Sequence, residues 1–263
     1  MSNLIQSFLG NALQKMVLKV SLLEAGIIKN LLIQLFIKNY QIDMSDYPRM
    51  SCHEYKHFND FFTREIHSNK RAIDASENGL ISPVDGKVIE FGRIDEGKLI
   101  QIKGMEYELF GLLDNNEMLA RNYEKGAFIS IYLAPFNYHR VHAPLKGRLK
   151  QATMVPGEMN RVDLKALSDI ENLYTKNQRL IAEFNDSRSD CILIMIAARN
   201  VASMTYKNQI KDFSKGDEVG RFNLGSTVVV LLPNDIETKW NQRVSSGNDV
   251  KVGEKIALLS KIK

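Results

Sequence analysis

The sequence predicts an α+β fold in which N-terminal amphipathic helices precede a β-rich core of the barrel-sandwich type, as in duplicated hybrid folds. Two observations predict it. Apolar residues recur at helical spacing within residues 1–44, whereas beyond residue 70 short apolar runs alternate with Gly, Asp, Asn and Pro. With 44% hydrophobic and 25% charged residues, the 263-residue chain can fill a core and is not a disordered chain.

Residues 1–44 contain two apolar stretches. In the first, the apolar residues at helical spacing are Leu4, Ile5, Phe8, Leu9, Leu13, Met16, Val17 and Val20. The second, residues 22–40, approaches the roughly 20 apolar residues that span a bilayer, but Glu24, Lys29 and Lys38 interrupt it. Residues 1–40 carry a net charge of +3. Apolar faces with basic residues are typical of helices that lie in a membrane interface; a helical hairpin packed on the protein's own core is the alternative.

The remaining residues, 45–263, are expected to form one domain. Its clearest strands are predicted at 128–133, 191–197 and 227–232, and a helical segment at 53–66. Two glycine-spaced segments, SPVDGKV (82–88) and SSGNDVKVGEKIALL (245–259), are similar to the paired hairpins of biotinyl and lipoyl carriers. The second includes a turn built on Gly253.

Composition narrows the classes of partner and compartment. The net charge of +4 is not bunched in one run, which argues against a nucleic-acid partner and is compatible with an anionic membrane surface. Cys52 and Cys191 are too few and too far apart for a disulfide framework, so a reducing compartment is expected. No signal peptide is evident in the sequence.

Two histidine pairs could carry chemistry. His53 and His57 lie four residues apart on the predicted helix, but a solvated helix face explains them better than a metal site, and no metal is required. His139 and His142 lie in APFNYHRVHAP, directly after a predicted strand, where sites tend to be built. In an extended chain the two would point to opposite sides, and in a turn they could converge. A polar turn with two incidental histidines is the alternative.

Asp85 and Ser226 each have an ordinary explanation. Asp85 precedes a glycine, as turn aspartates do; it could instead orient an imidazole, as in a serine–histidine–aspartate set. Gly225 and Ser226 lie at the start of a predicted buried strand, and a Gly-Ser pair in that position is usually part of a turn.

The Gly225–Ser226 pair also suits self-cleavage. The seryl hydroxyl can attack the preceding carbonyl, and Gly225, which lacks a Cβ, allows the strained backbone that exposes it. β-Elimination of the resulting ester gives dehydroalanine, which hydrolyses to a pyruvoyl group. A base is needed for both steps, and Asp85 with a histidine could supply it.

Six segments together resemble the phosphatidylserine decarboxylase family, in family order over most of residues 55–235. They are FNDFFTREI (58–66), SPVDGKV (82–88), QIKGMEYEL (101–109), YLAPFNYHRVHAP (132–144), VPGE (155–158) and GRFNLGST (220–227). The combination of Leu-Gly-Ser-Thr, His-Arg-Val-His and Val-Asp-Gly carries the resemblance.

The resemblance implies a function and assigns roles to residues. Asp85, His142 and Ser226 would drive cleavage between Gly225 and Ser226, giving a β chain (1–225) and an α chain (226–263) that stay together as a heterodimer. Ser226 would become the pyruvoyl cofactor, which forms a Schiff base with phosphatidylserine, and His139 would serve the decarboxylation to phosphatidylethanolamine and CO2. A lipid substrate favours interfacial helices in residues 1–44 and a peripheral place on the cytoplasmic side of the cell membrane. A higher oligomer is possible in principle.

Some positions depart from the family pattern, and other functions compete. Ala72, Asn137 and Gln178 stand where many relatives have Pro, Asp and Glu, which affects secondary contacts.

One rival function is that of an uncleaved Ser226–His142–Asp85 hydrolase, although the Gly-x-Ser-x-Gly elbow is missing. A carrier module is another, but the sequence has no Met-Lys-Met. A third keeps the pyruvoyl but acts on a different serine-derived or amino-acid substrate.

Overall fold

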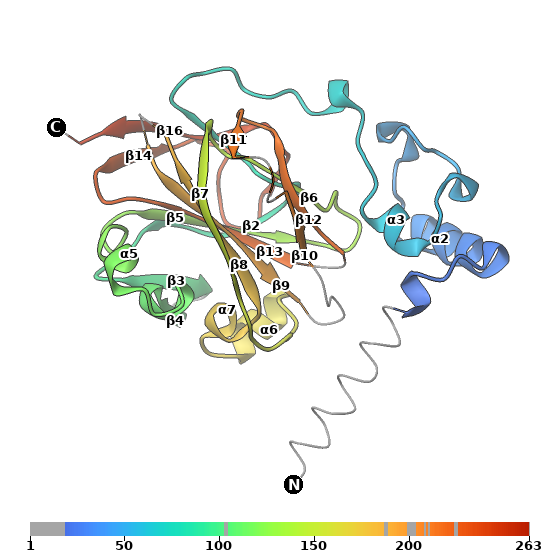
Figure 1. Ribbon diagram of the computed structural model, residues 1–263, viewed down its shortest axis with the longest axis horizontal. Coiled ribbons are helices and arrows are strands. Elements are labelled where there is room, and N and C mark those ends of the chain that lie inside the picture. Colours follow the sequence, from blue (N-terminus) through green and yellow to red (C-terminus); the bar gives the residue numbers. More distant parts are fainter. Residues whose placement is uncertain are drawn as a thin grey trace, which may run out of the picture.

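The computed structural model describes residues 19–102, 105–186, 189–198, 204–207, 209, 211–223 and 226–262. An open eight-stranded antiparallel sheet forms its centre (Figure 1). In spatial order its strands are β11 (Asp212–Phe213), β7 (Gly147–Val155), β8 (Arg179–Asn185), β9 (Cys191–Ala197), β13 (Ser226–Leu232), β5 (Ala127–Leu133), β2 (Gly86–Arg93) and β15 (Asp249–Val250).

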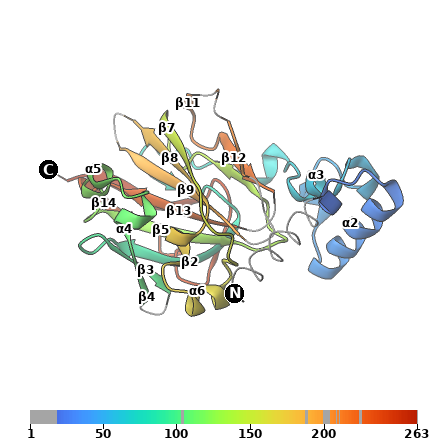
Figure 2. The same cartoon turned by 60° about the horizontal axis from the view of Figure 1, so that its bottom comes forward.

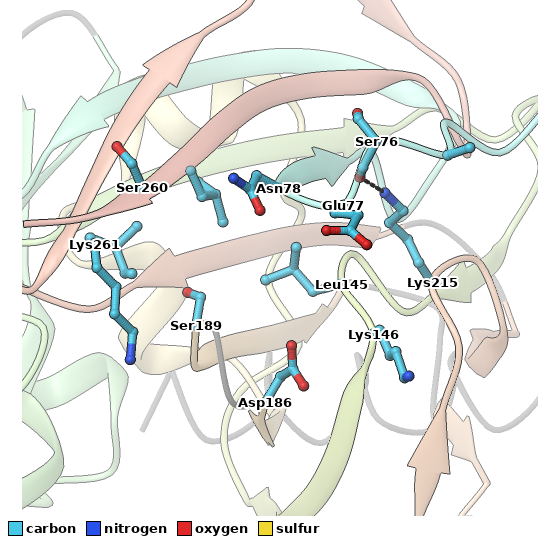
Figure 3. A pocket seen from close by; sticks show the side chains of 13 residues that line it. Ser76, Glu77, Asn78, Leu145, Lys146, Asp186, Ser189, Lys215, Ser260 and Lys261 are labelled. Atoms are coloured by element: carbon cyan, nitrogen blue, oxygen red, sulfur yellow. Dashed lines mark hydrogen bonds between the residues drawn. The ribbon is translucent and has the colours of Figure 1, made fainter.

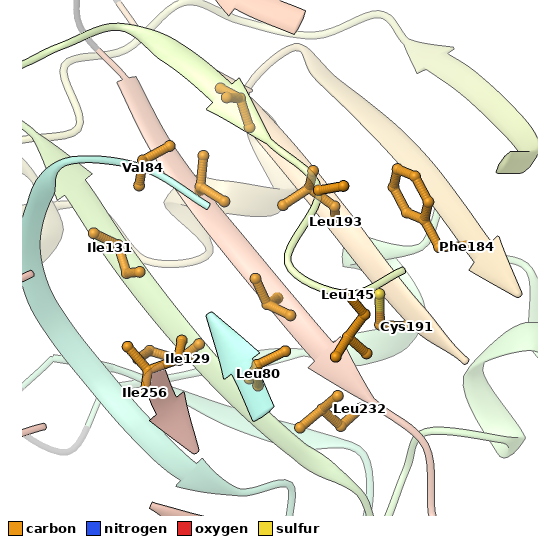
Figure 4. Packing of buried hydrophobic residues seen from close by; sticks show 14 of the residues in the cluster. Leu80, Val84, Ile129, Ile131, Leu145, Phe184, Cys191, Leu193, Leu232 and Ile256 are labelled. Carbon is orange, nitrogen blue, oxygen red and sulfur yellow. The ribbon is translucent and has the colours of Figure 1, made fainter. Parts of the chain in front are cut away.

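β13 lies between β9 and β5 and pairs with both along its length. All seven of its residues are buried. Because successive side chains in a strand point to opposite faces, Val228 and Val230 enter one apolar cluster while Val229 enters another. The sheet therefore separates two cores, and Figure 4 shows side chains of the first.

Smaller elements cover the two faces of the large sheet. The first core is closed by a sheet of β1 (Gly79–Ile81), β16 (Lys255–Lys261) and β14 (Ile236–Trp240), and by a sheet of β10 (Met204–Tyr206), β12 (Glu218–Phe222) and β6 (Arg140–His142). The second core is closed by the β3 (Lys98–Ile102)–β4 (Met105–Glu108) hairpin and by α4 (Leu109–Leu112), α5 (Glu117–Arg121), α6 (Leu164–Asp169) and α7 (Leu173–Lys176).

The predicted α+β class is confirmed, because helices and a dominant set of strands occur together. The three strands predicted from apolar runs are confirmed as β5, β9 and β13. The barrel-sandwich description is not confirmed, since no sheet of the described residues closes into a barrel. Residues 245–259 divide instead between sheets: β15 pairs with β2, and β16 pairs with β1 and β14.

The turn predicted at Gly253 is confirmed. Its φ is +87°, in the left-handed region, and a Cβ there would lie 2.5 Å from the carbonyl oxygen of Ala72. Only glycine satisfies both conditions without strain. The turn thereby brings residues 249–256 against the segment that leads into β1.

The single helix predicted at 53–66 is wrong. The segment contains the end of the 3₁₀ turn η2 (Cys52–Glu54) and the short helix α3 (Phe58–Phe62). Ser51 and Glu54 form a capping box that starts η2, and the extended His57 starts α3 by accepting a hydrogen bond from the Asp60 N–H. The two histidines are thus not one helical turn apart, and His53 Nδ1 instead contacts Asn30.

α2 (Gly26–Tyr40) and α3 form a helical lobe, residues 19–62, which stands to one side of the sheets in both views (Figures 1 and 2). It also contains the 3₁₀ turn η1 (Met44–Asp46), and η3 (Ser68–Lys70) follows it. Ring contacts from Phe36 to Phe58, Phe61 and Phe62 hold α2 against α3. The first predicted amphipathic stretch lies almost wholly in residues 1–18, outside the described residues.

The side of α2 that packs on the protein contains apolar residues and one buried lysine. Lys29 and Ile33 are buried, and the Lys29 ammonium donates to the carbonyls of Cys52 and Tyr55. Six large apolar side chains are exposed as well, two directly before α2 and four on it: Leu22, Leu23, Ile27, Ile28, Leu31 and Leu35. We call these six residues the apolar face. In the described part of the chain, no helix is both long and apolar enough to cross a bilayer.

Candidate active site

The turn that carries Asp85 lies directly beside β6. The backbone N–H of His142 donates to the carbonyl of Pro83 at 2.8 Å, and the Ile81 N–H donates to Pro144 at 3.1 Å. Gly86 permits a close approach on the other side, because a Cβ there would lie 2.4 Å from the carbonyl oxygen of Tyr132. The glycine-spaced segment at 82–88 thus places Asp85 next to His142 in space.

The Asp85 carboxylate is fully engaged by other groups. Arg71 donates to Oδ1 from Nε at 3.0 Å and to Oδ2 from Nη2 at 2.5 Å. The backbone N–H of Val252 donates to Oδ1 at 2.8 Å. Within the described residues no hydrogen bond joins Asp85 to His142, so the direct aspartate–histidine contact of a serine–histidine–aspartate set is not formed in this structure.

His142 is held by two contacts of its own. Nδ1 lies 2.7 Å from the carbonyl oxygen of Gly216, and Nε2 lies 3.1 Å from the Tyr138 hydroxyl. A carbonyl can only accept, so the proton is on Nδ1 and Nε2 is the basic nitrogen. Burial lowers the pKa of His142, although the carboxylates of Glu218 and Asp85 oppose that shift. The imidazole is therefore neutral at pH 7.

His139 occupies a different environment. It is fully buried, its Nδ1 donates to the carbonyl of Asn137 at 2.7 Å, and its ring lies 4.1 Å from that of Phe62 in α3. Burial lowers its pKa to about 3. Nε2 is buried and has no hydrogen-bond partner among the described residues. The two histidines are three residues apart and share none of these partners, so they do not converge on one group.

Ser226 opens β13 opposite Leu133 of β5 and Ala197 of β9. Its hydroxyl is completely buried and, in the part of the chain that is described, has no hydrogen-bond partner. A buried hydroxyl without a partner costs free energy, and a catalytic role is one explanation of such an exception. Gly225, the other half of the predicted cleavage site, lies outside the described residues.

The structure thus places the turn that carries Asp85 beside His142 of β6, and it adds Arg71, Tyr138 and Gly216, which the sequence interpretation did not single out. Tyr138 was within reach of prediction, since it adjoins the histidine pair in a recognised segment. Arg71 was not, because nothing in its spacing from Asp85 indicates an ion pair. No hydrogen bond of the described residues connects Ser226 Oγ to either imidazole.

The three departures from the family pattern have modest consequences. The Asn137 side chain accepts a hydrogen bond from the Ala134 N–H at 2.8 Å, which an aspartate would accept equally well. Gln178 Nε2 contacts the sulfur of Met154 at 3.7 Å on the surface. The backbone carbonyl of Ala72 lies close to Gly253. None of the three contacts Asp85, His142 or Ser226 directly in the bonds described above.

A cavity of about 590 Å³ lies elsewhere. Figure 3 shows its lining, in which lysines and carboxylates are mixed. Lys215 donates to the carbonyl of Ser76 at 2.6 Å within it. Asp85, His139, His142 and Ser226 do not line this cavity.

Comparison with known proteins gives one consistent result. The family described as phosphatidylserine decarboxylase matches residues 58–258. A phosphatidylserine decarboxylase proenzyme of Psychrobacter arcticus is 38% identical, with 88% of each chain covered. The proenzyme of Psychromonas ingrahamii is 36% identical, over 93% of this chain and 92% of its own, and that of Shewanella putrefaciens is 35% identical, over 94% and 93%. The family resemblance expected from the sequence motifs is confirmed.

Proposed function

The chain belongs to the phosphatidylserine decarboxylase family, and from that premise we propose that it converts phosphatidylserine to phosphatidylethanolamine and CO2 after cutting itself between Gly225 and Ser226. The observation that carries the proposal is the Ser226 hydroxyl, buried at the start of β13 without a partner among the described residues. Relatives named as proenzymes are in keeping with a chain that is made as a precursor.

Self-cleavage begins with the Ser226 hydroxyl. Attack of Oγ on the Gly225 carbonyl breaks the peptide C–N bond and leaves an ester. Loss of the Ser226 Cα proton then expels the Gly225 carboxylate, and water releases ammonia from the resulting dehydroalanine to leave a ketone. Both proton removals need a base.

His142 is the base that the geometry supports. Its Nδ1–H is fixed on Gly216, so Nε2 carries the lone pair, and its lowered pKa keeps it unprotonated at neutral pH. Asp85 supports it through charge rather than through a hydrogen bond, since an adjacent carboxylate favours the imidazolium that forms when the proton arrives. Arg71 keeps that carboxylate in place.

A pyruvoyl group at position 226 would supply the electron sink that stabilises the carbanion left by CO2 loss, in the way that other cofactors supply hard chemistry. The residues present fit this group, because position 226 is enclosed and has no competing hydrogen-bond partner among the described residues. His139 supports the second step: Nδ1–H is held by Asn137, and Nε2, which has no hydrogen-bond partner in the described part of the chain, can take up a proton and return it.

After cleavage the α chain would stay bound without a covalent link. It would contain β13, β14, β15 and β16. Of these, β13, β15 and β16 pair with strands of the β chain, whereas β14 pairs with β16. β13 is hydrogen-bonded on both edges to strands of the β chain, β5 and β9, and β16 pairs with β1 of the β chain on one edge. The heterodimer of α and β chains follows from this interleaving.

Docking on the cytoplasmic surface of the cell membrane would bring the site to its substrate. The apolar face of α2 supports this role, because an exposed cluster of large apolar side chains marks an interaction surface. α2 packs on the protein through Ile33 and Phe36, which leaves the exposed apolar side chains available for another surface. Such a helix suits the interface plane of a bilayer.

Intact-mass analysis of the purified full chain tests the proposal. We expect two chains divided after Gly225, the smaller with a blocked N-terminus, and a single uncut, inactive chain for Ser226→Ala. An intact wild-type chain with a free serine hydroxyl would contradict self-cleavage. A cut protein that releases CO2 from another amine but not from phosphatidylserine vesicles would instead contradict the substrate.

A further inference from the structure

Tyr138 contacts His142 and also packs with Val252, a residue that binds Asp85. Its hydroxyl is 3.1 Å from His142 Nε2, and the two rings stack with centroids 5.6 Å apart and an interplanar angle of 28°. On its other side Tyr138 packs with Val252, whose N–H donates to Asp85. The tyrosine is buried, with 4% of its surface exposed.

The direction of the hydrogen bond follows from His142. Nδ1 must carry the proton because it faces the Gly216 carbonyl, so Nε2 of the neutral ring can only accept. The Tyr138 hydroxyl is therefore the donor. A donor on Nε2 stabilises the neutral imidazole relative to the imidazolium, and together with Gly216 it fixes the plane of the ring.

Each of the two carboxylates that face His142 is paired with an arginine. Glu218 of β12 is the register partner of His142, and Arg140 donates to it at 2.8 Å. Asp85, on the adjacent turn, is bound by Arg71. The Tyr138 hydroxyl thus remains as the group that contacts the basic nitrogen directly.

We propose that Tyr138 is a positioning residue for self-cleavage, whose hydroxyl holds Nε2 of His142 unprotonated and correctly oriented until the Ser226 proton is transferred. The inference rests on the proposed function of His142 as the base. Within the described residues no side-chain hydrogen bond joins Tyr138 to His139, so the later decarboxylation is not expected to depend on Tyr138.

The first experiment follows self-cleavage of the full chain made by cell-free translation, over a range of pH. For Tyr138→Phe, which keeps the stacked ring, we expect a rate about tenfold lower at neutral pH, the size of one hydrogen bond. The midpoint of its acid limb should also move to higher pH, because the neutral imidazole has lost its donor. The control is Tyr47→Phe, which removes a hydroxyl from the same buried cluster without touching His142.

A lower rate with an unmoved acid limb in Tyr138→Phe would mean a structural role and overturn the proposal, as would an unchanged rate. A shifted limb in Tyr47→Phe as well would also overturn it. Failure of the wild-type chain to cut would instead contradict the proposed function.

A second measurement does not depend on cleavage or on the folding of the tyrosine variant. In the uncut Ser226→Ala protein, the ¹⁵N shifts of His142 should show the proton on Nδ1 and a hydrogen-bonded Nε2. A proton on Nε2 would overturn the proposal. Where Ser226→Ala combined with Tyr138→Phe folds, its His142 should titrate at higher pH than in Ser226→Ala alone.

Discussion

The guanidinium of Arg71 binds the carboxylate of Asp85 through Nε and Nη2, and the two side chains are only 9% and 8% exposed. The same carboxylate accepts from the Val252 N–H, which would belong to the α chain after cleavage. Asp85 therefore connects the Arg71 segment to the C-terminal residues. In the proposed cleaved form, the carboxylate that we propose supports His142 would therefore also link the two chains.

Removing Arg71 should destabilise the fold, because it leaves a buried carboxylate without its cation. In the uncut Ser226→Ala background, we expect Arg71→Gln to lower the free energy of unfolding by about 3 kcal/mol, measured by urea denaturation. The matched control is Arg121→Gln, which breaks an ion pair with Glu117 whose side chains are 70% and 71% exposed and should cost less than about 0.5 kcal/mol. Equal losses in the two variants would contradict a buried, energetically important pair.

The elements that could be predicted from sequence are those with strong local signals. The run that forms β13 is continuously apolar because both faces of the strand are buried, and its position was predicted to within one residue. The segment at 53–66 was mispredicted because the 3₁₀ turn η2 ends at Glu54 and the His57 side-chain cap starts a separate helix, and a cap inside an apolar pattern is hard to recognise. Sheet membership of residues 245–259 depends on long-range pairing, which their glycine spacing does not encode.

In the candidate site, too, features with a local sequence signal could be predicted and long-range contacts could not. Asp85 and His142 stand in recognisable motifs, so their residues could be predicted from sequence. Their hydrogen-bond partners could not, since Arg71, Gly216 and Val252 reach them from segments 14 to 167 residues away. Whether the two histidines converge was open in the sequence, and their separate partners, Phe62 for His139 and Tyr138 for His142, now distinguish them.

His139 should be needed for decarboxylation and not for processing. We expect His139→Ala to cut itself at a rate close to wild type but to lose about 100-fold or more in CO2 release from phosphatidylserine, the usual contribution of an acid–base group. Gel analysis of processing and a ¹⁴C-carboxyl release assay separate the two steps. His67→Ala, at an exposed position, should behave as wild type. An uncut His139→Ala chain would mean that the roles of the two histidines are exchanged.

Stability should fall on mild acidification because His139 is buried in its neutral form. Its native pKa of about 3 lies below the unfolded value of about 6.5. Between these values the unfolded chain binds the proton and the native chain does not, so stability is lost as pH falls. In the Ser226→Ala background this contributes a loss of roughly 2 kcal/mol from pH 7 to pH 5. His139→Gln should remove that part of the pH dependence in urea titrations at the two pH values; an identical pH dependence would show that His139 is protonated in the native state.

The apolar face of α2 should determine binding to lipid. Ile27 is 87% exposed and Leu31 is 55% exposed, and each would bury apolar surface on insertion into the interface, where full burial of such a side chain contributes about 1.5–3 kcal/mol. We expect Ile27→Glu combined with Leu31→Glu to reduce binding to vesicles containing phosphatidylserine at least tenfold in sedimentation assays, while self-cleavage continues. Met118→Glu is the matched control, because Met118 is 81% exposed but lies on α5, away from the helical lobe. Vesicle binding that is equal in the double variant and the wild type would contradict docking through α2.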